Sequence, residues 1–418
     1  MTRRRGALAL AMAMVAVLAA CGSGKTSSSS AGSTTVTTGV RVAVSSTTAA
    51  ASTTVLANGT EATRDKVPWS AVGPGWTLAV WSPATGEGPG EQPPAGAPTI
   101  SSSPETVYLL NPAGGRYAIA TLPAPGDRDE ELAAWSGDGR RALFTEGGAS
   151  TTAQTSIIEL DLTTGTTHTF TVPGNVTAQY TRPAGKAVLL RRDAIDSTPA
   201  SLERVDLTGA HQLTFPASFP GVGAINGDAL PSLDGTQLVM SAATGMALVA
   251  NGGAFLRTLG TSAAGTSCSP VRWWTPDQVL ASCLTGSTPR LWLVPTSGAA
   301  ATALTAVPSG RDLGDMTAWQ VPAGTFVQAA GACGLVYLAT LNADHSTAPV
   351  TLQGVDTDNS VFLLGADGGR LALRATVACG GGVSLLWFDP AAGTTNVILG
   401  PPVNGGGVIN ALLYPPSS

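Results

Sequence analysis

Residues 132–144 read LAAWSGDGRRALF, and this stretch decides the fold. An apolar segment leads into the Asp138-Gly139 turn and a second apolar segment follows, which is the pattern of a β-hairpin. A second copy, LPSLDGTQLVM, occupies residues 230–240. A hairpin that recurs in this way indicates a fold built from copies of one antiparallel unit.

Weaker copies of the central turn recur along the rest of the chain. Each copy is followed by another hairpin, and successive turns lie roughly 43 to 49 residues apart, except for a longer first interval that holds a Gly/Pro-rich insertion. The weaker turns centre on residues 73–75, 183–186, 275–277, 322–324 and 365–368. A four-stranded unit of this length is typical of a propeller blade. We therefore predict an all-β chain that forms a β-propeller of seven four-stranded blades, with six or eight as alternatives.

The turn motif resembles the TolB-like propeller repeat of bacterial envelope proteins. Residues 135–144 and 231–240 carry the resemblance, and the other copies have drifted from it. That family includes scaffolds, partner-docking modules and domains appended to hydrolases. The resemblance therefore implies a propeller fold and does not choose among these functions.

The C-terminal segment is expected to close the ring. Residues 408–414 read as an innermost strand that completes the first blade, because an unpaired strand edge is a liability. Residues 66–72 could take the same position, so the sequence leaves two candidates for the closure.

The N-terminus reads as a lipoprotein signal peptide over residues 1–20. Three consecutive arginines, residues 3–5, precede an apolar run that is shorter than a membrane-spanning helix requires. The lipobox pattern LAAC at residues 18–21 then predicts lipidation of Cys21. An ordinary secretory signal and a transmembrane anchor are the alternatives, and the arginines leave open whether export uses the Sec or the twin-arginine route.

Domain boundaries follow from composition. Residues 21–62 consist almost entirely of Ser, Thr, Ala, Gly and Val, which predicts a disordered tether after the lipidated cysteine. Residues 63–418 form the predicted propeller. We expect a monomer at the cell membrane, held on its extracytoplasmic side through the lipid on Cys21.

Composition and charge argue against several classes of protein. Hydrophobic residues make up 43% of the 418 residues and charged residues only 12%, which argues against a disordered chain and against long salt-bridged helices. With a formal net charge of −5 and lysine only at positions 25, 66 and 186, the chain has no basic stripe for nucleic acid. No cofactor is expected, although calcium or another divalent metal stays open.

Four cysteines follow Cys21, and an even number in an exported chain favours disulfides. In the blade pattern, Cys268 precedes the fifth blade and Cys283 ends the second strand of that blade, so both lie at one face. Cys333 and Cys379 occupy the matching strand end in the sixth and seventh blades. We predict the pairs Cys268–Cys283 and Cys333–Cys379. A zinc site is the alternative, but the spacing Cys-x-x-Cys is absent.

No catalytic motif stands out. There is no Gly-x-Ser-x-Gly, no His-Glu-x-x-His and no phosphate-binding loop. His168 and His211 fall at the start of outermost strands and His345 just before one, so we expect all three at the outer rim of the propeller.

One face of the predicted propeller collects acidic residues in the loops between blades and between second and third strands. As a hypothesis, this acidic rim docks a cationic ligand, a metal ion or a basic partner. Arg192 and Arg272 are expected on the same face and would neutralise part of it. The alternative is that these polar loops carry charge without forming a site. The candidates are Asp127, Asp129, Asp193, Asp228, Asp312, Asp315, Asp356 and Asp358.

The sequence therefore predicts a non-catalytic binding or scaffold module for a protein, peptide or glycan of the cell envelope. The alternative is a propeller enzyme of the lyase, cyclotransferase or lactone hydrolase type. Such an enzyme would use the acidic loop face, with or without a bound divalent metal.

Overall fold

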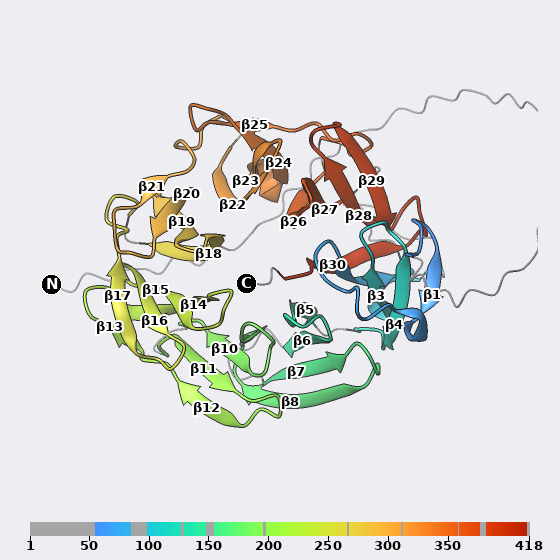
Figure 1. The fold of residues 1–418 in the computed structure, drawn as a ribbon, viewed down its shortest axis with the longest axis horizontal. Helices are drawn as coiled ribbons and strands as arrows, with labels where there is room; N and C mark the ends of the chain where they lie inside the picture. Colours follow the sequence, from blue (N-terminus) through green and yellow to red (C-terminus); the bar gives the residue numbers. More distant parts are fainter. Residues whose placement is uncertain are drawn as a thin grey trace, which may run out of the picture. The chain divides into compact units, whose positions relative to one another are not determined.

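The computed structural model describes residues 55–84, 98–126, 129–147, 154–194, 198–265, 267–310, 312–357, 359–376 and 382–415. These residues form a ring of seven sheets, seen face on in Figure 1. The predicted all-β propeller with seven blades is confirmed. The helical segments in these ranges are short 3-10 turns at Arg64–Lys66 (η1), Ile100–Ser102 (η2) and Ala332–Gly334 (η3). None of the described helices is long and apolar enough to cross a membrane.

Blade 1 joins the two ends of the propeller. Its strand order is β1 (Glu61–Thr63), β4 (Arg116–Leu122), β3 (Glu105–Leu110), β2 (Thr77–Ser82) and β30 (Gly407–Leu413). The innermost strand, β30, pairs antiparallel with β2 and places Leu413 opposite Thr77. The predicted closure by residues 408–414 is confirmed, and residues 66–72 form no strand.

In the other six blades the strands follow one another from the channel outward in chain order. Blade 2 has β5 (Asp129–Trp135), β6 (Arg141–Gly147), β7 (Gln154–Asp161) and β8 (Thr167–Pro173). Blade 3 has β9 (Thr177–Tyr180), β10 (Val188–Arg192), β11 (Ser201–Val205) and β12 (His211–Thr214). Blade 4 has β14 (Gly223–Pro231), β15 (Gln237–Ala242), β16 (Gly245–Ala250) and β17 (Phe255–Leu259), with the short β13 (Ser218–Phe219) beside β14. Blade 5 has β18 (Cys268–Thr275), β19 (Gln278–Thr285), β20 (Thr288–Pro295) and β21 (Thr302–Ala303); blade 6 has β22 (Gly314–Val321), β23 (Gly324–Ala330), β24 (Val336–Leu341) and β25 (Thr347–Pro349); blade 7 has β26 (Val361–Asp367), β27 (Arg370–Thr376), β28 (Val383–Asp389) and β29 (Thr394–Leu399).

The hydrophobic core lies between neighbouring blades. Successive side chains of a strand point to opposite faces of its sheet. In β6, Ala142 and Phe144 therefore pack toward blade 1, whereas Leu143 packs toward blade 3. The second strands of the blades are apolar without alternation because both of their faces are buried.

The ring has two faces, which differ in the connections they carry. The turn face carries the turns between first and second strands, and the loop face carries the connections between blades and between second and third strands. On the turn face, a Cβ atom at Gly137 would lie 1.7 Å from the Pro183 carbonyl oxygen of blade 3. A Cβ atom at Gly235 would lie 2.1 Å from the Arg182 carbonyl oxygen. Glycine at these positions lets neighbouring turns approach each other closely around the channel.

Candidate functional site

A cavity of about 470 Å³ lies in the central channel near the turn face. Its wall comes from the ends of the innermost strands β5, β9, β14, β18, β22 and β30 and from the turns that follow them. Most of the lining is apolar or aromatic. The polar and aromatic side chains that line it are Trp135, Gln179, Tyr180, Arg182, Arg272, Trp273, Trp274, Thr275 and Trp319.

Arg272 of β18 is held between aromatic rings in this cavity. Its guanidinium carbon lies 3.4 Å from the ring centroid of Trp319 and 5.7 Å from that of Trp274. Its Nη1 donates a hydrogen bond of 3.3 Å to the carbonyl oxygen of Ala318. Burial lowers the pKa of Arg272 to about 10, so the side chain stays protonated at neutral pH.

The charge of the cavity lining is opposite to that of the whole protein. Arg182 joins Arg272 in the lining, and burial lowers the pKa of Arg182 as well. Among the described residues that line the cavity, none is an aspartate, a glutamate or a histidine. Because the chain has a formal net charge of −5, the cavity is a positively charged region in an acidic protein.

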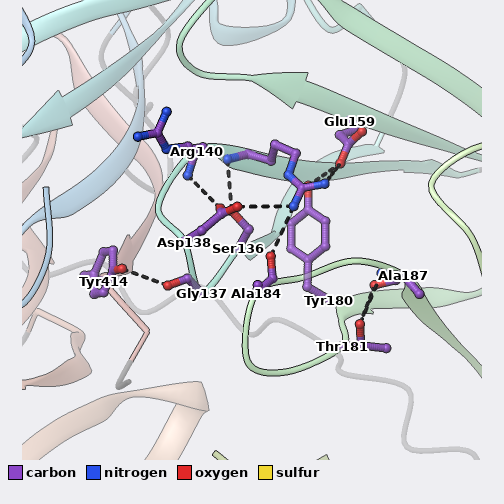
Figure 2. A network of polar contacts seen from close by, with 11 residues as sticks. Ser136, Gly137, Asp138, Arg140, Glu159, Tyr180, Thr181, Ala184, Ala187 and Tyr414 are labelled. Atoms are coloured by element: carbon purple, nitrogen blue, oxygen red, sulfur yellow. Dashed lines mark hydrogen bonds and ion pairs between the residues drawn. The ribbon is translucent and has the colours of Figure 1, made fainter. Parts of the chain in front are cut away.

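Polar contacts between blades 2 and 3 hold the wall that contains Tyr180 (Figure 2). The Arg141 Nη2 donates to the Ala184 carbonyl oxygen at 3.1 Å and to the Asp138 carboxylate at 3.3 Å. The Arg141 Nη1 lies 3.7 Å from Glu159 Oε1, which also accepts a hydrogen bond of 3.1 Å from the Tyr180 hydroxyl. Burial raises the pKa of Glu159, while Tyr180 and Arg141 oppose that rise. The ring of Tyr180, which belongs to blade 3, is thus held in position by Glu159 and Arg141 of blade 2.

The closing segment supports the adjacent wall. Tyr414, which directly follows β30, donates a hydrogen bond of 2.8 Å from its hydroxyl to the Gly137 carbonyl oxygen (Figure 2). Its ring packs edge-on against Trp135 with 5.1 Å between centroids. Closure of the ring therefore also shapes the cavity.

The structure divides the predicted acidic rim into separate groups. Asp127 and Asp358 lie outside the described residues, and so does the side chain of Asp129. Asp193 and Asp228 both contact Arg191, Asp193 through an ion pair of 3.2 Å. Asp228 also accepts a hydrogen bond of 2.6 Å from Ser269. One guanidinium therefore pairs with two carboxylates, so this group keeps one uncompensated negative charge.

Asp312 and Asp315 are buried rather than placed on an open rim, with 8% and 1% of their surface exposed. The Asp312 carboxylate accepts hydrogen bonds from the Gly314 N–H at 2.9 Å and the Thr347 hydroxyl at 2.7 Å. Both Asp315 oxygens are sealed from solvent without a well-aligned hydrogen-bond donor. Burial raises the pKa of Asp315 to about 7. Asp315 lies beside Thr305 and Arg290 of blade 5, whereas the partners of Asp312 belong to blade 6. The sequence pattern did not predict the burial of either carboxylate.

Asp356 is exposed and lines an apolar pocket of about 330 Å³ on the loop face of blade 6. Leu313, Leu335, Tyr337 and Val355 contribute to this pocket, and Leu313 is 52% exposed. This part of the loop face is therefore more apolar than the sequence predicts.

The Cys268–Cys283 disulfide is confirmed, with an S–S distance of 2.10 Å. Cys268 is the first residue of β18 rather than part of the preceding loop, and it lies directly opposite Cys283 of β19. Cys21, Cys379 and the side chain of Cys333 lie outside the described residues. The second pairing and the lipidation therefore stay predictions.

The histidines lie on the outer rim as predicted. His168 and His211 belong to the outermost strands β8 and β12, His345 precedes β25, and all three are exposed. Among the residues that the structure describes, no group of three or more His, Cys, Asp or Glu side chains is arranged to hold a metal ion.

The sequence interpretation missed the channel cavity. Arg272 was expected on the loop face, but the structure places it in the cavity lining with Trp274 and Trp319. A signal was present in residues 272–274, because the run Arg-Trp-Trp places a cation next to two aromatic residues on one strand. Nothing in the sequence pairs this run with Trp319, which belongs to the next blade.

Comparisons with known proteins bear on the fold alone. No protein-family model matches the sequence, and no curated protein matches it significantly. Similar solved structures include one from a study of two prolyl endopeptidases (13% identity over 77% of this chain and 49% of that chain, TM-score 0.48). TolB from Acinetobacter baumannii is another, with 13% identity over 82% of this chain and 67% of that chain and a TM-score of 0.39. A third is an oligogalacturonate lyase in complex with manganese, with 13% identity over 78% of this chain and 85% of that chain and a TM-score of 0.44. The chain spans about half the length of the first of these, and the likenesses carry no argument about activity.

Proposed function

We propose that this protein is a lipid-anchored, extracytoplasmic β-propeller that binds a protein, peptide or glycan of the cell envelope and does not transform it. The channel cavity carries the proposal. Aromatic rings, apolar side chains and a few placed polar groups are the usual composition of a ligand site. Trp274 and Trp319 supply the rings, Leu412 and Leu413 the apolar side chains, and Arg272 a polar group. The lipobox that ends at Cys21 supports the anchor.

The test is affinity capture from envelope membranes with the full chain as bait, with and without calcium and a chelator. We expect a specific partner to be captured by the wild-type protein and lost with the cavity variant Trp319→Ala. A Cys21→Ser variant is expected to move from the membrane to the soluble fraction. Capture that is unchanged in Trp319→Ala would place the binding surface elsewhere, and a membrane-bound Cys21→Ser variant would refute the lipid anchor.

The enzyme alternative requires carboxylates that reach a substrate on the loop face. Of the described candidates, Asp312 and Asp315 are buried and Asp228 is tied to Arg191 and Ser269. Asp193 and Asp356 are exposed and could reach a substrate. Thermal stability that falls on addition of a chelator, without any captured partner, would favour a metal-dependent activity at this face over the binding module.

A further inference from the structure

The channel cavity contains a cation that the described fold does not neutralise. The depressed pKa of Arg272 has burial as its only cause, and no carboxylate among the described residues forms an ion pair with it. A guanidinium has five N–H donors, of which Ala318 takes one. A half-buried cation with unused donors favours an anionic ligand, since transfer of a charge out of water costs free energy unless it is paired.

Stacking fixes the orientation of this cation. With its guanidinium 3.4 Å from the Trp319 centroid, Arg272 lies against the face of the indole ring. A stacked guanidinium keeps its hydrogen-bonding edge in the plane of the group, where it matches the two oxygens of a carboxylate. The ring therefore positions the donors before any ligand arrives.

The rest of the lining narrows the chemistry of the ligand. The same cavity is lined by aromatic and apolar side chains, among them Trp274, Tyr180, Leu412 and Leu413. A mostly apolar lining suits a carboxylate with one charge better than a phosphate, whose extra charge and third oxygen need further donors. A cavity of about 470 Å³ is within the range of sites for small ligands.

We infer that the channel cavity binds a carboxylate joined to an apolar or aromatic group, with Arg272 holding the carboxylate and the tryptophans holding the apolar part. Such a group occurs both in small free acids and at the C-terminus of a peptide that ends in an apolar residue. The inference rests on the proposed function, because it names the ligand class of the same site.

Isothermal titration calorimetry on the purified full chain tests the inference. The probes are 3-phenylpropionate and the peptide acetyl-Ala-Ala-Phe with a free carboxylate, each compared with its neutral amide. We expect the acids to bind at least 10-fold more tightly than the amides, because a hydrogen bond to a charged group is worth about 1.5–3 kcal/mol. If the peptide acid binds more tightly than 3-phenylpropionate, the carboxylate of the ligand is that of a peptide C-terminus. If the two acids bind equally, the ligand is a small acid.

Arg370 provides the matched control. Its guanidinium carbon lies 4.6 Å from the Trp387 centroid and its Nη1 donates to the Pro112 carbonyl oxygen, but it does not line the cavity. Arg272→Gln is expected to weaken binding of the acids about 10- to 100-fold. Arg370→Gln is expected to leave that binding unchanged. If Arg272→Gln fails to fold, Arg272→Lys keeps the charge but loses the planar fork, and we expect about 10-fold weaker binding.

Three results would overturn the inference: equal binding of acid and amide, acid binding that survives both Arg272 variants, or no binding of either acid to the wild-type protein. The outcomes for the proposed function are separate. A captured envelope partner without acid binding would leave the binding module standing and remove the ligand class. Acid binding without any captured partner would support the ligand class and would count against an envelope partner.

Discussion

Replacing Asp315 by asparagine should stabilise the propeller at neutral and alkaline pH. This carboxyl is 1% exposed and both of its oxygens are sealed from solvent. Burial raises its pKa from 3.8 to about 7; the neighbouring Asp312 adds to the rise, while Thr305 and Arg290 oppose it. Above pH 7 the wild-type protein therefore buries a poorly compensated negative charge, and asparagine removes that charge at nearly constant volume.

The sign of the pH dependence follows from proton binding. Between pH 4 and 7 the folded carboxyl retains a proton that the unfolded chain has already lost, so the free energy of unfolding decreases as the pH rises through this window. Since one pKa unit corresponds to 1.36 kcal/mol, the rise to about 7 is equivalent to a loss of about 4 kcal/mol at most. Below pH 4 the effect of Asp315 on the pH dependence of stability vanishes, because its carboxyl is neutral in both the folded and the unfolded state.

Urea unfolding between pH 4 and pH 8 measures the effect of Asp315 on the free energy of unfolding. We expect Asp315→Asn to match the wild-type protein near pH 4 within about 1–2 kcal/mol, since it exchanges one neutral polar group for another. At pH 8 we expect the free energy of unfolding of Asp315→Asn to exceed that of the wild-type protein by about 1 to 4 kcal/mol. Parallel stability profiles for the two proteins from pH 4 to pH 8 would refute the reasoning.

Asp344 supplies a control of opposite sign. It is exposed, and hydrogen bonds from the Ser346 hydroxyl and the Ser346 N–H lower its pKa. Its contribution to stability is therefore present above the ordinary pKa of aspartate and is lost as the pH falls. Asp344→Asn should give no gain at pH 8. A gain there equal to that of Asp315→Asn would show that removal of net negative charge, rather than burial, is responsible.

The remaining predictions concern the framework of the propeller. Gly137→Ala should lower the free energy of unfolding by about 1–3 kcal/mol, because its Cβ would collide with the Pro183 carbonyl oxygen of the next blade; an unchanged urea midpoint would contradict this. Replacing Cys268 and Cys283 together by serine should cost about 3 kcal/mol, the loop-entropy value for a separation of 15 residues, measured by thermal unfolding without reductant. Deleting residues 407–418 should leave β2 without its inner partner and abolish the cooperative unfolding transition, which circular dichroism would show; a sharp transition near the wild-type Tm would contradict it.

The architecture could be predicted from the sequence because its signals are local. A propeller blade is a chain of hairpins between strands that are adjacent in sequence, so each turn motif and the apolar segments beside it predict pairing without any long-range information. The same reasoning predicts an inner partner for β2 and offers residues 408–414 or 66–72 for it, and the structure selects residues 408–414. The pairing of Cys268 with Cys283 was also within reach, because both belong to one predicted blade.

The candidate site depended on tertiary structure because its members come from different blades. Arg272 and Trp319 lie on the innermost strands of blades 5 and 6, and Tyr180 lies on that of blade 3. Their meeting depends on how the blades tilt and stack around the channel, which a repeat pattern does not encode. The burial of Asp315 beside Arg290 and Thr305 of blade 5 has the same origin. The sequence by itself determined a ring of four-stranded blades and the candidate strands that could close it, because these signals are local. Only the packing of blade against blade decided which charges meet solvent and which meet aromatic rings.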